Sequence, residues 1–180
     1  MRLEYVDTMA GDDTDDSMSA TEMSTVPTVP RFDEFFVAAH REMVRALALA
    51  LGDAELGRDA ASEGFCRALE RWKRVSRYDN PSGWVYRVGL NWATSRRRKT
   101  RREAFDRVPE LPAPSVAPVD EELVRCLRGL SVDHRSVIVG RYYLDWSEAQ
   151  LAEALGVAPG TVKSRLSRAL EQLTTMLETS

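Results

Sequence analysis

The stretch Trp146–Leu166, WSEAQLAEALGVAPGTVKSRL, decides the fold of the second half of the chain. Two short amphipathic runs are separated by Gly-Val-Ala-Pro-Gly, and basic residues appear only after this break. Ser147 followed three residues later by Gln150 forms a capping box, and Gly156 stands where a left-handed helix stop is expected. Pro159 suits the first position of a helix. The stretch therefore predicts two helices joined by a tight turn.

The second of these helices is predicted to have two unlike faces. Apolar side chains share one stripe, which consists of Val162, Leu166, Ala169, Leu170, Leu173 and Leu177. Small hydroxyl and basic side chains occupy the other side and its flanks, namely Thr161, Lys163, Ser164, Arg165, Ser167 and Arg168. Such side chains allow a helix to lie in a major groove and to donate to phosphates and base edges. The break is therefore predicted to be the turn of a helix-turn-helix, although two helices joined through a glycine also occur as an ordinary packing unit.

The rest of the ordered chain also shows helical spacing and no strand-like alternation, so the predicted fold class is all-α. A first helix is predicted from Phe32 to Leu51, with Gly52 as its stop signal. A second is predicted by the spacing of Ala61, Phe65, Ala68, Leu69 and Trp72. The segment SRYDNPSG, residues 76–83, is predicted to be a loop, and a third helix is predicted to start near Trp84. Before the helix-turn-helix, two further helices are predicted by Leu123, Leu127 and Leu130 and by Val137, Ile138 and Tyr142.

Two segments are predicted to lack regular structure. Residues 1–30 carry one arginine against seven acidic residues and little periodic apolar content, which is typical of a disordered acidic tail. Residues 108–119, VPELPAPSVAPV, contain four prolines and are predicted to be a flexible Pro-rich linker. The linker divides the ordered chain into two small helical modules, residues 31–107 and 120–180.

Charge and composition exclude several classes of function. The net charge is −3, yet residues 91–107 carry seven basic and two acidic side chains, which indicates a phosphate-binding surface or a solvated basic helix end. The chain has no apolar run long enough to span a membrane and no signal peptide, so a cytoplasmic location is expected. Cys66 and Cys126 are expected to be reduced and buried or half-buried, and with two histidines they give no zinc spacing. Without a phosphate loop or a nucleophilic triad, neither an enzyme nor a cofactor is expected.

From Phe32 to Leu177 the chain resembles bacterial RNA polymerase sigma factors of the extracytoplasmic-function group, in the sigma-70 family. Asp59–Trp72, DAASEGFCRALERW, resembles the core-binding helix of region 2, and Asn80–Ala93, NPSGWVYRVGLNWA, resembles its promoter-melting segment. Leu130–Leu173 resembles region 4. The resemblance implies a transcription initiation factor that binds core polymerase, recognises −35 and −10 promoter elements and helps to melt the DNA. The alternative is a free-standing helix-turn-helix regulator that binds duplex DNA.

The resemblance also implies roles for individual residues. Core polymerase binding is implied for Asp59, Ser62, Glu63 and Arg67. Capture of the unpaired −10 strand is implied for Tyr78, Asn80, Asn91, Ser95, Arg96, Arg97, Arg98, Lys99, Arg101 and Arg102. Contact with the −35 duplex is implied for Thr161, Lys163, Ser164, Arg165, Ser167 and Arg168, with Arg165 and Arg168 expected to matter most.

Four further points accompany the resemblance. Ser62 stands where family members commonly have Gln, which implies a shorter contact, and Ala158 at the N-cap of the last helix should cost about 1 kcal/mol. An anti-sigma factor is an expected partner. The acidic tail is hypothesised to cover the basic surface around Arg96–Arg102 in the free protein, with an inert extension or a misplaced start codon as open alternatives.

Overall fold

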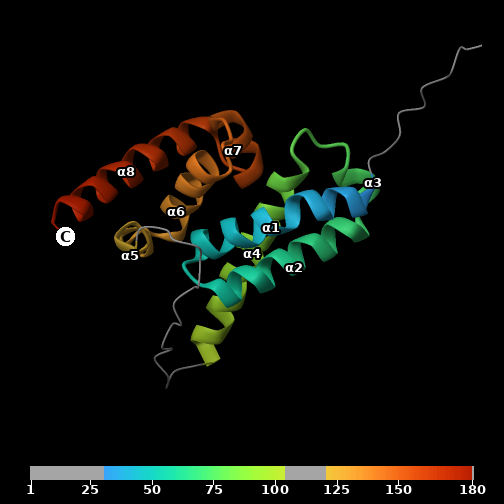
Figure 1. Ribbon diagram of the computed structural model, residues 1–180, viewed down its shortest axis with the longest axis horizontal. Helices are drawn as coiled ribbons and strands as arrows, with labels where there is room; N and C mark the ends of the chain where they lie inside the picture. Colours follow the sequence, from blue (N-terminus) through green and yellow to red (C-terminus); the bar gives the residue numbers. More distant parts are fainter. Residues whose placement is uncertain (1–30, 104–120, 180) are drawn as a thin grey trace, which may run out of the picture.

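The computed structural model describes residues 31–103 and 121–179, and within these ranges every regular element is a helix (Figure 1). The predicted all-α class is therefore confirmed for the described part of the chain. The predictions made for the acidic tail and for the Pro-rich linker fall entirely on residues outside it. The first module comprises the described residues 31–103, and the second module comprises the described residues 121–179.

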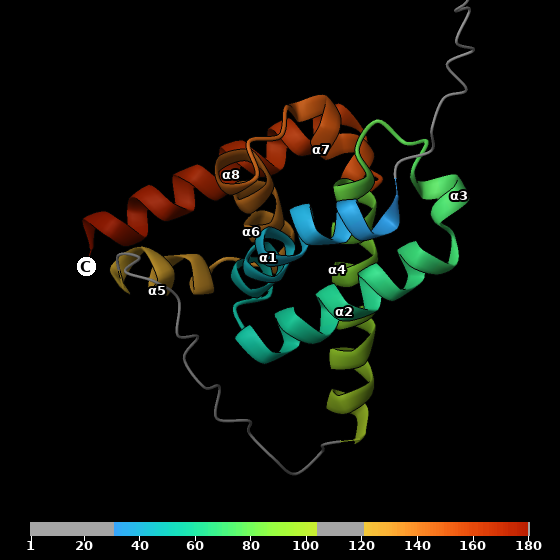
Figure 2. The same cartoon turned by 45° about the vertical axis from the view of Figure 1, so that its right-hand side comes forward.

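The first module is a bundle built on two antiparallel helices and a long third helix that crosses them (Figure 2). Its elements are α1 (Phe32–Leu51), α2 (Ala54–Glu70), the short α3 (Trp72–Val75) and α4 (Pro81–Glu103). The predicted stop at Gly52 is confirmed, since this glycine ends α1 with φ of 68°. The helices α1 and α2 approach so closely that a Cβ atom on Gly57 would lie 2.4 Å from the Cα of Ala48.

The start of α4 differs from the prediction. The helix begins at Pro81, whereas the sequence predicted a loop through Gly83. Proline is tolerated in the first helical turn because its missing N–H would have no partner there, so the Asn-Pro and Ser-Gly pairs mark a helix start instead of a continuous loop. Asn80 caps this turn: its Oδ1 accepts a hydrogen bond of 2.8 Å from the Gly83 N–H.

Aromatic side chains hold the start of α1 against the start of α3. Phe35 stacks on Trp72 with ring centroids 4.9 Å apart, and Phe32 meets the same indole edge-on at 5.3 Å. Two predictions for α2 were wrong here. Leu69 is 57% exposed although its spacing suggested the apolar face, and Cys66 is exposed instead of buried or half-buried. Cys126 is buried, and both thiols are free.

The second module contains the predicted helix-turn-helix. Its elements are α5 (Glu121–Gly129), α6 (Val132–Ile138), the π-helix η1 (Val139–Tyr143), α7 (Glu148–Leu155) and α8 (Pro159–Glu178). The capping box of Ser147 and Gln150 is confirmed, as are the left-handed Gly156 and the position of Pro159 at the start of α8. The apolar stripe of α8 is buried at Val162, Leu166, Ala169 and Leu173. Leu170 and Leu177 lie at its margin and are exposed.

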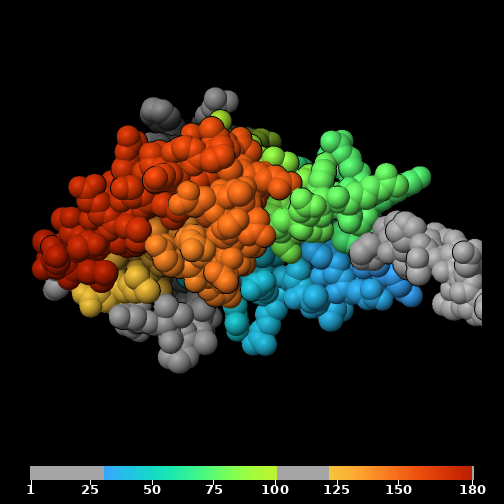
Figure 3. All heavy atoms as spheres, turned by 90° about the horizontal axis from the view of Figure 1, so that it is seen from above, coloured from blue at the N-terminus to red at the C-terminus, as the bar shows by residue number. Residues whose placement is uncertain are grey.

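The two modules pack directly against each other. The helix α4 contacts α7, and α1 contacts α6 and η1. In the space-filling view the second module abuts α1 and the start of α4 without an open gap (Figure 3). Buried apolar residues of both modules therefore form one core. The sequence predicted two modules but not this contact between them.

Candidate nucleic-acid interface

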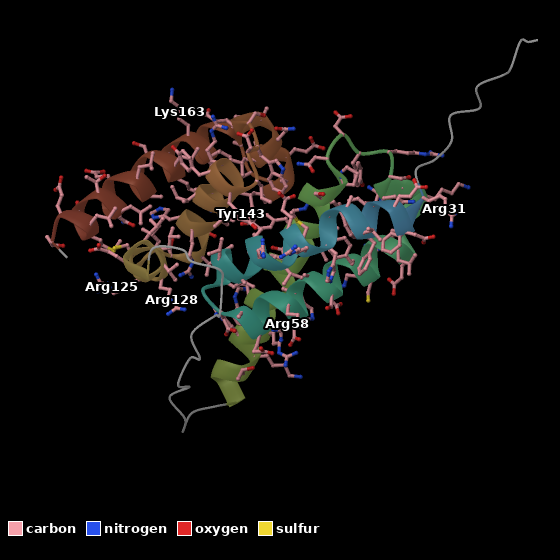
Figure 4. All side chains as sticks on the ribbon, in the orientation of Figure 1. Arg31, Arg58, Arg125, Arg128, Tyr143 and Lys163 are labelled. Atoms are coloured by element: carbon pink, nitrogen blue, oxygen red, sulfur yellow. The ribbon has the colours of Figure 1, made fainter. Side chains whose placement is uncertain are left out.

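The outward face of α8 presents most of the residues expected to contact duplex DNA. Four of them are exposed, namely Lys163, Ser164, Ser167 and Arg168, and Thr161 is half-buried. Lys163 points away from the first module (Figure 4). A Cβ atom on Gly160 would have no neighbour within 4 Å, so this end of the helix is open. As expected from Ala158, no side chain caps the helix.

Arg165 differs from its neighbours on α8 because it already has a protein partner. Its guanidinium Nη2 lies 2.7 Å from Oδ2 of Asp133, and its side chain is only 25% exposed. An ion pair with an exposed carboxylate contributes little stability, typically less than about 1 kcal/mol, so a phosphate can replace it. The pair places Arg165 at the edge of the α8 face, facing α6.

The long helix α4 carries a second polar face. Asn91, Ser95, Arg98 and Lys99 are all exposed, and the first three are spaced four and three residues apart, so they lie on one side of the helix. Arg101 and Arg102 continue the same helix, but the structure does not describe their side chains.

Two arginines of the basic cluster make contacts inside the first module. Arg97 donates to the carbonyl oxygen of Leu51 at 3.0 Å and lies 3.7 Å from a carboxylate oxygen of Asp53. Arg97 therefore supplies a hydrogen-bond donor to a carbonyl group at the C-terminal end of α1, in addition to any role on DNA. Arg96 lies 3.8 Å from Asp59 and 5.1 Å above the ring of Trp92. The expected polymerase-binding and DNA-binding residues thus meet at Asp59.

The segment between α3 and α4 borders a small pocket of about 130 Å³. Tyr78, Asn80, Trp84 and Arg87 line it from the first module, and Glu153 and Ala154 line it from α7. The Nδ2 of Asn80 is buried and has no hydrogen-bond partner. The pocket is thus lined by two aromatic rings and by the side chain of Asn80. Aromatic rings that stack on a base and polar groups that bond its edge are typical of sites that hold a flipped base.

The outward side of α2 carries the residues expected to bind polymerase. Asp59 and Ser62 are exposed, while Glu63 and Arg67 are half-buried and form an ion pair of 2.7 Å with each other. The exposed Cys66 and Leu69 extend this surface toward the end of the helix. Sequence reasoning missed both, since it assigned them to the buried side.

Sequence reasoning also missed Arg135, which is 5% exposed and lies between the modules. Its Nε donates to the carbonyl oxygen of Ala50 at 2.7 Å, and its Nη1 donates to that of Leu127 at 3.1 Å. Burial and, to a lesser extent, the charges of Arg97 and Arg128 lower the pKa of this guanidinium. The sequence did contain a signal for this role. Arg135 lies three residues before Ile138, so a charged side chain shares the apolar side of α6.

Tyr86 makes the second polar contact between the modules. Its hydroxyl donates to the carbonyl oxygen of Ser136 at 3.2 Å, and its ring meets Trp146 edge-on at 5.5 Å. Burial raises the pKa of the hydroxyl far above its ordinary value, so the group stays protonated and remains a donor. The structure buries Tyr86 completely.

The described ranges, 31–103 and 121–179, lack two other kinds of site. There, no three His, Cys, Asp or Glu side chains gather as metal ligands would. None of the helices there has the length and apolar character needed to cross a membrane.

Comparison with known proteins decides between the two functions that the sequence left open, a sigma factor and a free-standing regulator. Residues 36–103 match the family Sigma-70 region 2, and residues 120–173 match Sigma-70, region 4. The sigma factor SigL of Mycobacterium tuberculosis, an ECF RNA polymerase sigma factor, is 33% identical over 137 residues, which cover 71% of this chain and 77% of the relative. The chain belongs to the extracytoplasmic-function sigma factors of RNA polymerase. It is a transcription initiation factor that binds core polymerase and directs it to promoters, and not a free-standing regulator.

Two further similarities agree with this assignment. The sigma factor SigM of Mycobacterium tuberculosis is 31% identical over 156 residues, covering 81% of this chain and 76% of the relative. The fold is similar to that of the sigma factor RpoE in its complex with the anti-sigma factor NepR from Bartonella quintana, with a TM-score of 0.68 and 22% identity over 82% of this chain and 96% of that one. By the residues matched, the first module corresponds to region 2 and the second module to region 4. Sigma factors as a family are non-enzymatic transcription factors.

Proposed function

We propose that this sigma factor divides promoter recognition between two surfaces: α8 contacts the −35 duplex, and α4 with the preceding segment holds the single-stranded −10 element. The observation that carries the proposal is the open, polar and basic face that begins at Gly160 and continues along α8. The polar face of α4 from Asn91 to Lys99 supports the second part. The chemistry of RNA synthesis belongs to the polymerase, and the sigma factor acts without a cofactor in the cytoplasm.

Arg168 is proposed to be the strongest single contact to the −35 element, because it is exposed and forms no ion pair with the acidic side chains of residues 31–103 and 121–179. Replacing Arg168 with alanine should weaken binding of the holoenzyme to promoter duplex by about 1–3 kcal/mol. Fluorescence anisotropy with a labelled promoter fragment measures this change. Thr174→Ala, at an exposed position further along α8, is the matched control and should leave binding unchanged. Equal affinities for the two variants would contradict the assignment.

The outward side of α2 is proposed to dock on the polymerase through Asp59, Ser62 and the Glu63–Arg67 pair. Replacing Ser62 with arginine places a long charged side chain at the centre of this surface without disturbing the buried side of α2. The affinity for core polymerase should fall at least about tenfold, as expected when a bulky charge enters an interface. Ala38→Arg, at an exposed position on α1, is the control. Analytical size exclusion with core polymerase distinguishes the two, and co-elution of both variants would reject this surface.

An anti-sigma factor is proposed as a further partner, and an apolar groove supports its docking. The groove has a volume of about 450 Å³ and lies between the modules, with Arg45 as the charged residue on its wall. Apolar and aromatic side chains from both modules form the other walls, namely Leu49, Leu123, Leu127, Ile138, Val139, Tyr142, Tyr143, Leu170 and Leu173. An amphipathic helix with aliphatic side chains and one carboxylate directed at Arg45 fits this lining.

A genetic experiment tests the proposed partner. Leu170→Asp puts a charge into the groove at a position that is already 41% exposed, so the fold should tolerate it. If a partner represses the sigma factor through this groove, a reporter under a promoter of this sigma factor should be several-fold more active in cells with the variant. Thr174→Asp introduces the same charge on α8 outside the groove and should leave the reporter unchanged. Equal reporter activity in both strains would contradict docking at the groove.

A further inference from the structure

Three cations outside the α2, α4 and α8 surfaces gather next to the pocket beside Asn80. Lys73 and Arg74 belong to α3, and Arg77 lies two residues after its end; we call these three residues the α3 cluster. All three side chains are exposed. Figure 2 shows α3 beside the start of α4, whereas the basic residues 96–99 lie toward the opposite end of that helix. The α3 cluster is therefore a second positive surface, separate from the one on α4.

The α3 cluster has no acidic partner within the part of the chain that the structure describes. The arginines of the neighbouring helix differ in this respect, because Arg58 and Arg67 of α2 each lie 2.7 Å from a glutamate of the same helix. The three cations of the cluster fall within one turn of chain, in which the N–H of Arg77 donates to the carbonyl oxygen of Arg74. Like charges at such spacing repel one another. An unpaired cluster of this kind indicates a polyanionic ligand.

Tyr78 joins the α3 cluster to the pocket. The guanidinium of Arg74 lies 6.0 Å from the centre of the Tyr78 ring, and Tyr78 also lines the pocket together with Trp84. A row of cations and aromatic rings is typical of surfaces that bind single-stranded nucleic acid, because bases stack on the rings and phosphates pair with the cations. A strand whose base enters the pocket therefore passes next to the α3 cluster.

The pocket lies between the two positive surfaces. Trp84 and Arg87 line it from the start of α4. Arg96 follows Trp84 by twelve residues in the same helix, which corresponds to a rise of about 18 Å along the helix axis. The α3 cluster lies on the other side of the pocket, beside the start of α4 (Figure 2). Phosphates on one side of a flipped base thus face α4, and those on the other side face α3.

We propose that the α3 cluster binds the sugar–phosphate backbone of the melted strand, on the side of the flipped base that the basic residues of α4 do not reach. The inference rests on the proposed function, since it takes the pocket beside Asn80 as the place of the flipped base. It goes further by assigning Lys73, Arg74 and Arg77 to the strand. Contacts to phosphates position the strand and do not read its sequence, so the cluster holds the DNA open at any promoter that this sigma factor melts.

Replacing two cations of the cluster tests this contact. The variant is Lys73→Gln with Arg77→Gln, and Arg74 is kept because its guanidinium lies over Tyr78. The probe is a labelled single-stranded DNA oligonucleotide that carries the −10 element with about six nucleotides on each side, bound to the holoenzyme and followed by fluorescence anisotropy. Two lost phosphate contacts should make the slope of log affinity against log salt shallower by about 1.4 and weaken binding at physiological salt about tenfold.

A charge-matched control accompanies this variant. Arg41→Gln with Arg125→Gln removes the same charge from exposed positions on α1 and α5 and should change neither the slope nor the affinity. Equal slopes for the two double variants would overturn the proposal.

Shortened oligonucleotides locate the contact. Removing the extension on one side of the −10 element should abolish the difference between the unsubstituted protein and the Lys73–Arg77 variant, and removing the other extension should preserve it. A difference that survives both shortenings would contradict a contact next to the pocket.

An acidic surface of the polymerase is the competing ligand for the α3 cluster. In that case the Lys73–Arg77 variant would bind core polymerase more weakly by size exclusion, while its saturated holoenzyme would bind the oligonucleotide as tightly as before, and the proposal would be overturned. The proposed function fails in a different way. It falls if the unsubstituted holoenzyme does not bind the −10 strand, whereas binding that is lost with α4 variants and kept with the α3 variant overturns only the inference drawn for α3.

Discussion

Replacing Arg135 with methionine is expected to lower the free energy of unfolding by about 3 kcal/mol. Methionine fills much of the space of the arginine side chain but donates no hydrogen bond. The substitution leaves the carbonyl group of Ala50 without the Arg135 donor, and the carbonyl group of Leu127 loses one of its two donors. Because Arg135 joins α1, α5 and α6, the loss destabilises both the second module and its packing on the first.

Urea unfolding followed by circular dichroism measures this effect. Arg128→Met is the matched control, since Arg128 is an exposed arginine that projects from α5 (Figure 4). An exposed substitution of this kind should change the free energy of unfolding by no more than about 0.5 kcal/mol. If the Arg135 and Arg128 variants unfolded at the same urea concentration, Arg135 would have no role in joining the modules.

The second large effect is expected on DNA. Replacing Arg96 and Arg98 together with glutamine removes two exposed cations of α4 while keeping polar side chains of similar length. Binding of the holoenzyme to a single-stranded −10 oligonucleotide should weaken about tenfold or more at physiological salt. The slope of log affinity against log salt should become shallower by about 1.4, because each of the two lost phosphate contacts on a single strand contributes about 0.7. The loss should be similar for all sequences, as is typical of phosphate contacts.

A charge-matched control separates this effect from a general loss of positive charge. Arg41 and Arg125 are exposed arginines on α1 and α5, outside the polar face of α4. Their double replacement with glutamine should leave the salt slope unchanged. The same slope for both double variants would remove the α4 face from the proposed −10 surface and leave Arg96 with only its contacts to Asp59 and Trp92.

The elements that the sequence predicted well are those governed by local chemistry. Ser147, Gln150, Gly156 and Pro159 determine the ends of α7 and α8 through side chains and backbone angles within a few residues of one another. The same holds for Gly52 at the end of α1. Such signals do not depend on what packs against the helix, so a single sequence is enough to read them.

The features that the sequence did not predict depend on packing. The start of α4 is an exception, because its signal is local: Asn80 accepts from the Gly83 N–H three residues on, and the composition of the segment predicted a loop instead. Leu69 directly follows the buried Ala68 and is 57% exposed, so the apolar pattern at the end of α2 is wider than the face that the other helices cover. Arg135 depends on the approach of α1, whose last carbonyl groups are 84 and 85 residues away in the chain. Contacts of this range are set by the assembled core and not by local pattern.

The candidate site divides in the same way. The α8 face could be predicted because helical spacing alone separates its polar side chains from the buried stripe. The partners of Arg97 and Arg165 could not, because Leu51 and Asp133 belong to other helices. The pocket beside Asn80 has one wall from α7. The sequence did not predict this wall, because a linker separates α7 from the rest of the pocket along the chain.

Run-off transcription with purified core polymerase on a library of promoter fragments tests the central claim most directly. The account predicts transcription starts that appear only when this protein is added and that share sequence elements at −35 and −10. The absence of new starts, together with binding of the protein alone to duplex DNA, would contradict it. In that case α2 would not bind polymerase, and α4 and α8 would not recognise the −10 and −35 elements as proposed.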